Sequence, residues 1–320
     1  MPPPIEISSG LLSATVLPRG ATLAAVRFGT GAPNLLLGFA DPQDHARVPI
    51  YAGALVGPVA NRITGGRINI DGTRCQMPLN EAGGTTLHSG PDGLHALDWD
   101  VVRQTAQSVT LCRHLPDGAQ GLPGDRKITA TYRVEGCALW LDITAQTTRT
   151  TPMNIAAHPY WNLDQRRDVA GHLLQVNADH VLPVDAQNLP TGARASTQGT
   201  LFDFSTLRAV PLTPALDVNF CLADAPHAAP QAAAILRGAN GCQLDIATTA
   251  PGLQVYAGAF TPDMPGALEG GRDLCPYAGI ALEPQLWPDA PRHSQFPSIL
   301  LTPGQTWRQT TCFSLTPPAP

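Results

Sequence analysis

Runs in which apolar and polar residues alternate constrain the fold of this chain more than any other feature. Apolar residues occupy every second position over 128–134, over 139–145 and again over 242–246. Successive side chains of a strand point to opposite faces of the sheet, so this period indicates strands with one face in the core and one in water. Turn sequences separate the runs, and Asp71-Gly72 between two short runs is typical of a two-residue hairpin. The pattern predicts an all-β, antiparallel fold.

Helix-forming patterns are scarce, and nothing divides the chain into separate units. Residues 41–48 could form one or two helical turns, while 94–114 is ambiguous but contains a Val-Thr-Leu segment that favours a strand. The 32 prolines and 30 glycines lie between short runs along the whole chain, and no repeat of fixed period indicates a propeller or solenoid. We therefore predict a single large antiparallel β-sandwich domain over residues 1–316 and a frayed, proline-rich tail over 317–320.

Composition excludes several classes of function. Charged residues make up 14% of the chain and the formal net charge is −5, so there is no basic surface of the kind that nucleic acids require. No run approaches the roughly 20 apolar residues of a membrane span, and the first residues lack the basic flank and apolar stretch of a signal peptide. The seven cysteines are scattered without a Cys-x-x-Cys pair, which argues against a zinc ribbon or a disulfide scaffold and favours reduced thiols. We expect a cytoplasmic protein, monomeric or homodimeric, whose partner is a small molecule.

Two short segments each place a proton-transfer residue directly before a proline. These residues are His158 in His-Pro-Tyr-Trp-Asn-Leu and Glu283 in Leu-Glu-Pro-Gln. Proline disfavours helical geometry in the residue before it, so both should lie on strands or at strand ends. Extended backbone turns such a side chain toward one face of a sheet, where a pocket can collect both. An imidazole and a carboxylate that face one cavity form a general acid/base pair.

Four further segments set polar side chains in apolar surroundings. Arg62 follows the small residues 57–60, His88 precedes Ser-Gly, and Asp217 and Gln254 interrupt apolar strands. Burying such groups costs free energy unless each finds a hydrogen-bond partner. A sugar could supply these partners, because its hydroxyls both donate and accept hydrogen bonds.

These segments, taken in order, resemble those of the aldose 1-epimerases, the galactose mutarotase family. The resemblance covers nearly the whole chain; any one motif is weak, but together and in order they are specific. The matching motifs are Gly-Pro-Val-Ala-Asn-Arg-Ile (57–63), Leu-His-Ser-Gly (87–90), Pro-Asp-Gly-Ala-Gln-Gly-Leu-Pro-Gly (116–124), His-Pro-Tyr-Trp-Asn-Leu (158–163), Leu-Pro-Val-Asp (182–185), Pro-Thr-Gly (190–192), Gly-Thr-Leu-Phe-Asp-Phe (199–204), Leu-Glu-Pro-Gln-Leu-Trp-Pro-Asp-Ala (282–290), Phe-Pro (296–297) and Leu-Thr-Pro-Gly (301–304).

The resemblance implies a galactose mutarotase-like β-supersandwich with an open cleft and with neither a metal nor an organic cofactor. In this family a glutamate removes the proton of the anomeric hydroxyl while a histidine protonates the ring oxygen, so that the ring opens and recloses on the other face. Glu283 matches the base, His158 matches the acid, and His88 matches a second active-site histidine that holds or polarises the ring-oxygen side. The positions that grip sugar hydroxyls in the family are here Asn61, Arg62, Asp217 and Gln254.

The chain departs from the family pattern at three positions. Pro58 stands where a second arginine is usual, Ala157 stands where a polar residue is common before the histidine, and Pro284 stands where threonine is common after the glutamate. None of these departures removes a proton-transfer group, but each changes the surroundings of one. The preferred sugar could therefore differ from galactose or glucose.

Several of these residues also have a structural interpretation. A lone histidine in an apolar strand is more often structural than catalytic, and Glu283 and Arg62 could be partners in a buried ion pair. Tyr160 and Trp161 are expected in the core, with stacking against a sugar as the alternative, and Asp289 is expected in a turn. The dispersed histidines indicate no metal site. The histidines expected on the surface or in loops are His45, His95, His114, His172, His180, His227 and His293.

Other functions stay open on the sequence alone. A non-catalytic carbohydrate-binding protein could use the same cleft, although binding does not need both His158 and Glu283. A glycoside hydrolase needs two carboxylates about 5–9.5 Å apart, which Asp217 and Glu283 could supply. An epimerase that acts on a hexose 6-phosphate is a further alternative, although Arg166-Arg167 is the one compact arginine pair in the sequence.

Overall fold

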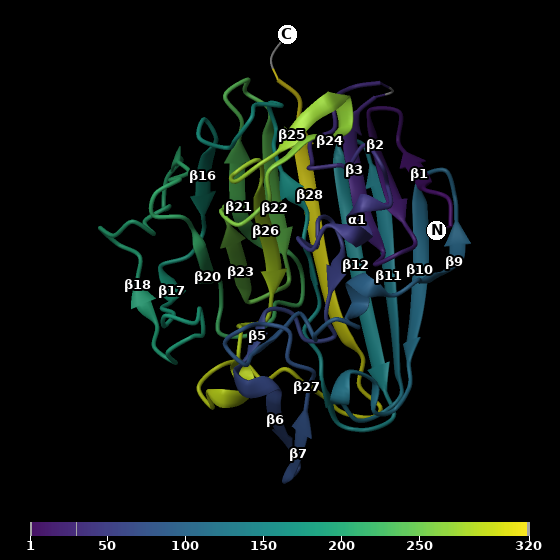
Figure 1. Ribbon diagram of the computed structural model, residues 1–320, viewed down its shortest axis with the longest axis vertical. Helices are drawn as coiled ribbons and strands as arrows, with labels where there is room; N and C mark the ends of the chain where they lie inside the picture. Colours follow the sequence, from purple (N-terminus) through teal and green to yellow (C-terminus); the bar gives the residue numbers. More distant parts are fainter. Residues whose placement is uncertain (1, 30, 319–320) are drawn as a thin grey trace.

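The computed structural model describes residues 2–29 and 31–318, and its largest element is a nine-stranded antiparallel sheet (Figure 1). The last strand of the chain lies in the middle of this sheet. In spatial order the strands are β19 (Arg208–Ala209), β16 (Leu173–Val176), β21 (Gln231–Arg237), β22 (Gln243–Thr248), β28 (Trp307–Thr316), β12 (Ala138–Thr147), β11 (Arg126–Glu135), β10 (Ser108–Leu115) and β9 (Asp100–Gln104).

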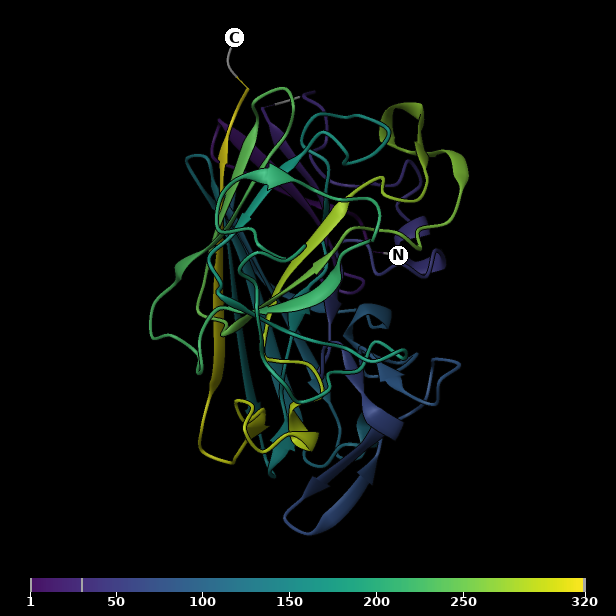
Figure 2. The same cartoon turned by 90° about the vertical axis from the view of Figure 1, so that its left-hand side faces the viewer.

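A second antiparallel sheet has six shorter strands and carries the residues of interest. In spatial order these are β15 (Tyr160–Trp161), β26 (Ile280–Gln285), β23 (Gly252–Tyr256), β20 (Asp217–Cys221), β17 (His180–Leu182) and β18 (Ala195–Ser196). In Figure 1 strand β26 overlaps the nine-stranded sheet, whereas after a quarter turn it stands apart from β28 (Figure 2). The two sheets therefore form separate layers.

Short strand pairs and single turns complete the fold. The three-stranded sheet is β1 (Ile5–Ser8), β2 (Leu12–Leu17) and β3 (Thr22–Phe28). The two-stranded pairs are β4 (Leu55–Val56) with β14 (Ala156–Ala157), β5 (Arg62–Ile63) with β8 (Thr86–Leu87), β6 (Arg67–Ile70) with β7 (Thr73–Gln76), β13 (Thr151–Pro152) with β27 (Leu300–Leu301), and β24 (Met264–Leu268) with β25 (Arg272–Leu274). The helical segments are α1 (Asp44–Arg47) and the 3₁₀ turns η1 (Thr64–Gly66), η2 (Leu94–Ala96), η3 (Ala119–Gly121), η4 (Glu269–Gly271) and η5 (Ala290–Arg292).

The core lies between the two sheets and is made by the alternating runs. The apolar side chains of β11, including that of Tyr132, are buried, while the residues between them are partly exposed. Phe220 and Leu253 of the six-stranded sheet belong to the same buried cluster. The rings of Trp161 and Phe313 connect the layers, with their centroids 5.5 Å apart. Burial of one face of each sheet against the other explains why this sequence forms two layers.

The structure confirms the predicted all-β, antiparallel sandwich. The runs over 128–134, 139–145 and 242–246 fall in β11, β12 and β22. The predicted hairpin pairs β6 with β7 through Asp71-Gly72, both of which have positive φ as a tight two-residue turn requires. The expected helical turn near 41–48 is α1, and the ambiguous stretch 94–114 is a 3₁₀ turn followed by strands β9 and β10, as favoured.

The remaining expectations concern the chain end, the thiols and membranes. Strand β28 ends at Thr316, residues 317 and 318 are exposed and irregular, and the rest of the expected tail, 319–320, lies outside the described residues. All seven cysteines are free, five of them buried. Over 2–29 and 31–318, none of the helices has the length and apolar character that crossing a bilayer would require.

Candidate active site

A cavity of about 380 Å³ on the six-stranded sheet contains every residue that the sequence predicts for the site. Its walls come from β15, β20, β23 and β26 and from the loops around 49–62 and 81–88. A larger hollow of about 500 Å³ beside Arg194 and Asp224 contains none of the predicted residues. The predicted residues that line the smaller cavity are Asn61, Arg62, His88, His158, Asp217, Gln254 and Glu283.

Adjacent strands bring Asp217, Gln254 and Glu283 to one face. Gln254 on β23 lies directly opposite Glu283 on β26, and Asp217 begins the neighbouring strand β20. Residues opposite each other in an antiparallel pair project to the same face, with their Cβ atoms about 5 Å apart. The register of the sheet therefore explains how residues far apart in the sequence share one cavity.

The proline after Glu283 does not interrupt this sheet. The N–H and C=O of one residue in an antiparallel strand point to the same side. The carbonyl of Pro284 accepts a hydrogen bond from Nε2 of Gln309, a residue of β28, at 3.0 Å. The missing N–H of Pro284 therefore also faces away from β23, on a side where β15 pairs only with Ile280 and Ala281. A proline is tolerated here because it removes no ladder hydrogen bond.

His158 lies in the short connection between β14 and β15. Its backbone N–H donates to the carbonyl of Ala54 at 3.0 Å, and its own carbonyl accepts from the N–H of Gly53 at 2.9 Å. The buried imidazole places Nε2 at 3.4 Å from Oε1 of Glu283. The structure thus brings together the two proton-transfer groups that stand 125 positions apart in the sequence (283 − 158).

Burial shifts the two groups in opposite directions. It raises the pKa of Glu283 well above the ordinary value of a glutamate; the carboxylate of Asp217 adds to the rise and Arg62 opposes it. Burial also lowers the pKa of His158 to about 4. Within the described chain, Oε2 of Glu283 and Nδ1 of His158 have no hydrogen-bond partner. A proton shared by this pair therefore rests on the carboxyl group, which leaves the imidazole neutral.

His88 is held by reciprocal hydrogen bonds with the backbone of Asn61. The His88 N–H donates to the Asn61 carbonyl at 3.0 Å, and the Asn61 N–H donates to Nδ1 of His88 at 3.1 Å. Both residues have positive φ, 52° and 62°, a backbone geometry that non-glycine residues rarely adopt. Because Nδ1 accepts a hydrogen bond, the proton of the neutral ring must be on Nε2. Burial lowers the pKa of His88 well below the ordinary value of a histidine, so this ring is a neutral donor.

The fixed tautomer decides whether this cluster suits a metal ion. One nitrogen or oxygen each of His88, His158 and Glu283 lie within 4.8 Å of one another, which resembles a two-histidine, one-carboxylate ligand set. A metal ligand must offer a lone pair, yet Nε2 of His88 carries the proton. The cluster therefore fits proton transfer better than metal binding. We call His88, His158 and Glu283 the proton-transfer end of the cavity.

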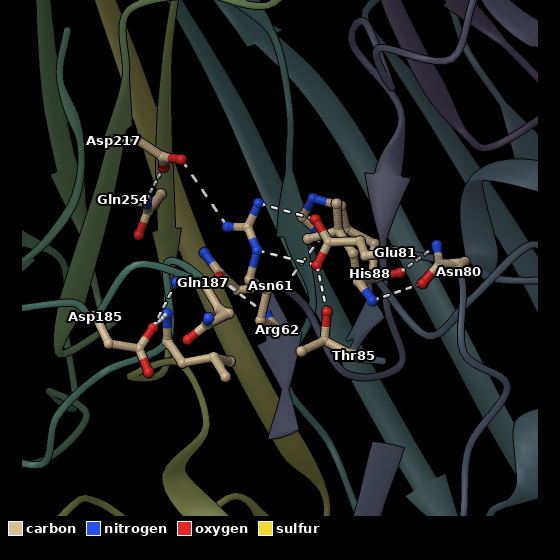
Figure 3. Close-up of polar contacts among 12 residues, drawn as sticks. Asn61, Arg62, Asn80, Glu81, Thr85, His88, Asp185, Gln187, Asp217 and Gln254 are labelled. Atoms are coloured by element: carbon tan, nitrogen blue, oxygen red, sulfur yellow. Dashed lines mark hydrogen bonds and ion pairs between the residues drawn. The ribbon is translucent and has the colours of Figure 1, made fainter. Parts of the chain in front are cut away.

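The other end of the cavity is built around Arg62 (Figure 3). The guanidinium donates from Nε and Nη2 to both carboxylate oxygens of Glu81, each at 3.0 Å, and its Nη1 lies 3.9 Å from Oδ2 of Asp217. Gln254 donates from Nε2 to Oδ1 of Asp217 at 2.7 Å. Burial raises the pKa of Asp217, while Arg62 and Gln254 oppose this shift. We call Arg62, Glu81, Asp217 and Gln254 the binding end.

Sequence reasoning missed several side chains of the cavity wall. Glu81 lies in the irregular segment between β7 and β8, and Tyr51 packs its ring edge-on against His88 with centroids 4.7 Å apart. Tyr256 and the exposed Phe260 also line the cavity. The one signal available in the sequence was an acidic residue, Glu81, which stands among polar neighbours seven positions before His88. An acid in a glycine-containing loop has no periodicity that would assign it to a wall.

The residues that were expected in the core, in a turn or at the surface agree with the structure to different degrees. Trp161 lies in the core as expected, whereas Tyr160 is buried and also forms part of the cavity wall. Asp289 is in a turn with φ 53°, and it also accepts hydrogen bonds from the backbone and hydroxyl of Thr64. His172 was expected at the surface or in a loop. It lies in the loop before β16, but its ring is fully buried, and Nε2 accepts the backbone N–H of Leu163 at 2.9 Å.

The two other departures from the family pattern, Pro58 and Ala157, contact the rest of the protein through their backbone atoms. The carbonyl of Pro58 accepts the N–H of Asn154 at 2.7 Å, and Ala157 pairs with Leu55 where β14 meets β4. Neither Pro58 nor Ala157 lines the cavity. Both positions therefore support the walls without touching a ligand in the cavity.

Known proteins resemble this chain along its whole length. The family model described as aldose 1-epimerase matches residues 3–314. The chain belongs to the aldose 1-epimerase family. Among its relatives, the galactose mutarotase of Rattus norvegicus is 35% identical over 96% of this chain and 92% of that protein. The aldose 1-epimerase of Escherichia coli K12 is 31% identical over 93% of this chain and 90% of that protein.

Solved structures agree with this assignment. An aldose epimerase homologue from C. elegans superposes with a TM-score of 0.90 at 32% identity, covering 99% of each chain. A galactose 1-epimerase from Lactobacillus acidophilus superposes with a TM-score of 0.84 at 27% identity, covering 99% of this chain and 95% of that one. The predicted galactose mutarotase-like sandwich is therefore confirmed.

Proposed function

We propose that this protein interconverts the α and β anomers of a free aldose by opening and reclosing the sugar ring, and that it does so in the cytoplasm. The observation that carries the proposal is the buried contact of 3.4 Å between Nε2 of His158 and Oε1 of Glu283 at one end of a cavity lined with hydrogen-bonding groups. Family membership supports the same reaction. The free thiols suit a reducing compartment.

Ring opening needs one proton removed and one proton supplied. In the proposed mechanism the proton that the pair shares first moves from Glu283 to His158. The carboxylate of Glu283 then takes the proton of the C1 hydroxyl, and the C1–O1 bond becomes a carbonyl as the C1–O5 bond breaks. The electron pair of that bond goes to O5, which receives a proton from the imidazolium of His158. The products of this step are the open-chain aldehyde, protonated Glu283 and neutral His158, so protons and electrons balance.

Reclosure reverses these transfers on the opposite face of the aldehyde. Rotation about the C1–C2 bond turns the carbonyl over, O5 attacks C1, and His158 takes back the O5 proton while Glu283 returns its proton to O1. The shared proton then returns from His158 to Glu283, so the enzyme ends in its starting state and needs no water, reductant or oxidant. Acid–base help of this kind contributes typically about 10²–10⁴-fold.

The burial of the pair favours the state that ring opening must reach. Raising the pKa of Glu283 and lowering that of His158 both stabilise the protonated carboxyl beside the neutral imidazole. This is the protonation state that accompanies the open-chain aldehyde. We infer that the charged pair, once formed, reacts readily, because in this site Glu283 is a stronger base and His158 a stronger acid than either group is in water.

His88 has a separate role in this proposal. Its Nε2–H is a neutral donor whose direction is fixed through Asn61, and the ring packs edge-on against His158 with centroids 5.5 Å apart. We assign it to hydrogen bonding at the ring oxygen, where negative charge develops as the C1–O5 bond breaks. Hydroxyls farther along the sugar would be held by Arg62 and the other residues of the binding end, and by the side chain of Asn61.

The alternative functions have less support. The carboxylate of Asp217, which a hydrolase would need, is already engaged by Gln254 and Arg62. Simple binding would not require two groups with opposed pKa shifts in contact. For a sugar phosphate, Arg62 is the natural ligand, yet both of its fork nitrogens are taken by Glu81.

The direct test is to follow freshly dissolved α-anomers of glucose, galactose and other aldoses by polarimetry and by ¹H NMR. We expect the approach to anomeric equilibrium to accelerate in proportion to protein concentration, with the final anomer ratio unchanged. A rate equal to that of buffer for every aldose would contradict the proposal.

A further inference from the structure

We propose that Glu81 is a specificity-determining positioning residue, which orients Arg62 and cancels its charge so that the cavity prefers uncharged aldoses to anionic ones. This inference rests on the proposed function, because it names the property by which the same site would select its substrate. Glu81 acts through Arg62 and takes no part in proton transfer.

The contact between Glu81 and Arg62 is built for orientation. Two parallel hydrogen bonds of 3.0 Å join the guanidinium fork to the carboxylate, an arrangement that fixes the plane of both groups. The hydroxyl of Thr85 donates to Oε2 of Glu81 at 2.6 Å and so fixes the carboxylate from its other side. With Nε and Nη2 engaged, Arg62 offers Nη1 to the cavity.

The loop that carries Glu81 is itself anchored to the backbone beside His88. Asn80 donates from Nδ2 to the carbonyl of Leu87 at 3.0 Å and accepts the Leu87 N–H on Oδ1 at 2.7 Å (Figure 3). The amide side chain of Asn80 thus makes the pair of backbone hydrogen bonds that a neighbouring strand would make to β8. The position of Glu81 is therefore set by several independent hydrogen bonds and is not an incidental surface contact.

The charges along the cavity explain the selectivity. Arg62 is the one lysine or arginine among the described residues that line it, whereas Glu81, Asp217 and Glu283 are all acidic. The side chains of Arg62 and Glu81 are only 15% and 26% exposed, so water screens them incompletely. A carboxylate or phosphate on the sugar would meet a guanidinium that is already neutralised and further acidic groups nearby. Neutral hydroxyls meet no such repulsion.

The experiment compares D-glucose with D-glucuronate, which share a ring and differ by one negative charge, in wild type and in Glu81→Gln. Glutamine keeps the size and one acceptor oxygen but removes the charge. Exchange between anomers is measured by NMR at low ionic strength. We expect KM for glucose to rise about fivefold with kcat changed less than twofold. The ratio of kcat/KM for glucuronate to that for glucose should rise at least about tenfold, since one like charge has been removed from a largely buried site.

Two control variants separate charge from structure. Thr85→Val removes the hydroxyl that orients Glu81 but leaves every charge in place, so it should raise KM for both sugars equally and leave their ratio unchanged. Glu135→Gln removes a carboxylate that pairs with Arg133 on β11, away from the cavity, and should change neither sugar. Thermal unfolding of each variant establishes that it is folded.

The outcomes distinguish this inference from the proposed function. If the wild type accelerates glucose but Glu81→Gln leaves the glucuronate-to-glucose ratio unchanged, Glu81 is only structural and the inference is overturned. If the wild type accelerates no aldose, the proposed function fails instead. The selectivity is then measured directly, as the ratio of calorimetric dissociation constants for the two sugars, and an unchanged ratio in Glu81→Gln again overturns the inference.

Discussion

The two ends of the cavity satisfy their polar groups very differently. At the binding end Arg62, Glu81, Asp217 and Gln254 bond to one another, so that each carboxylate already has partners. At the proton-transfer end, one atom each of Glu283 and His158 has no partner within the described chain.

This difference indicates that the binding end fixes the geometry of the cavity, whereas the proton-transfer end supplies its reactivity. Groups that satisfy one another hold a fixed geometry and change little when a sugar arrives. Buried groups that lack partners keep shifted pKa values, and these shifts supply driving force for proton transfer. The following experiments test this contrast, because a change at one end should alter turnover and a change at the other should alter affinity.

The largest effect is expected from Glu283→Gln. The amide preserves the shape of the side chain but cannot take the C1 hydroxyl proton, so kcat should fall about a thousandfold, within the range for a lost general base. KM should change little. Saturation kinetics with α-glucose measure both quantities, and Glu135→Gln serves as the matched control. A loss smaller than about tenfold would remove Glu283 from the proposed mechanism.

His158→Ala should follow with a loss of about a hundredfold in kcat. The effect is smaller because water can enter the space that the ring leaves and can protonate O5 slowly. Imidazole added to the assay should restore part of the lost rate in this variant and none in Glu283→Gln. Wild-type turnover in His158→Ala would show that O5 is protonated by another group.

A third experiment uses pH and stability to measure the opposed shifts. Burial lowers the pKa of His158 to about 4, so between about pH 4.5 and 6.5 the unfolded chain binds a proton there that the folded chain does not. Burial raises the pKa of Glu283, so above the ordinary glutamate pKa the folded chain keeps a proton that the unfolded chain loses, until the pH passes the raised value. The stabilising contribution of His158 thus falls on acidification while that of Glu283 falls as pH rises, so the two oppose each other.

Glu283→Gln removes one of these two opposed contributions. The free energy of unfolding of the variant should therefore fall more steeply on acidification than that of the wild type. Urea unfolding at three pH values measures the difference. Parallel stability curves for the two proteins would mean that Glu283 is ionised in the folded state.

The smallest effect is expected at the binding end. Arg62→Ala should raise KM about tenfold, the scale of one charged hydrogen bond, and should change kcat less than threefold. The same assay measures both. An unchanged KM would show that Arg62 does not bind the sugar. A large loss of kcat would contradict the proposal that one end of the cavity sets turnover and the other sets affinity.

Much of the fold could be predicted from local pattern. The alternation that buries Tyr132 places β11 and β12 correctly, and Asp71-Gly72 has the backbone freedom that a tight turn demands. The order of strands in the nine-stranded sheet could not be predicted in the same way. Pairing of β28 with both β22 and β12 depends on contacts between residues far apart in the chain, which period and turn chemistry do not encode.

The site shows the same limit. His158 and Glu283 precede prolines inside recognisable motifs, so their extended backbones could be anticipated, although their contact at 3.4 Å could not. Glu81 was missed because its role depends on where an irregular loop meets Arg62. The loop position of His172 agrees with the sequence, but its burial could not be predicted, because it depends on contact with the backbone of Leu163.

The central position of β28 in the large sheet has a consequence for folding during synthesis on the ribosome. This strand joins the half of the large sheet built from residues 100–147 to the half built from residues 173–248, and its Gln309 supports the carbonyl next to Glu283. Every cavity residue has left the exit tunnel before this strand does. A nascent chain that ends before β28 thus contains every cavity residue but lacks the central strand of the large sheet and the side chain that holds the Pro284 carbonyl.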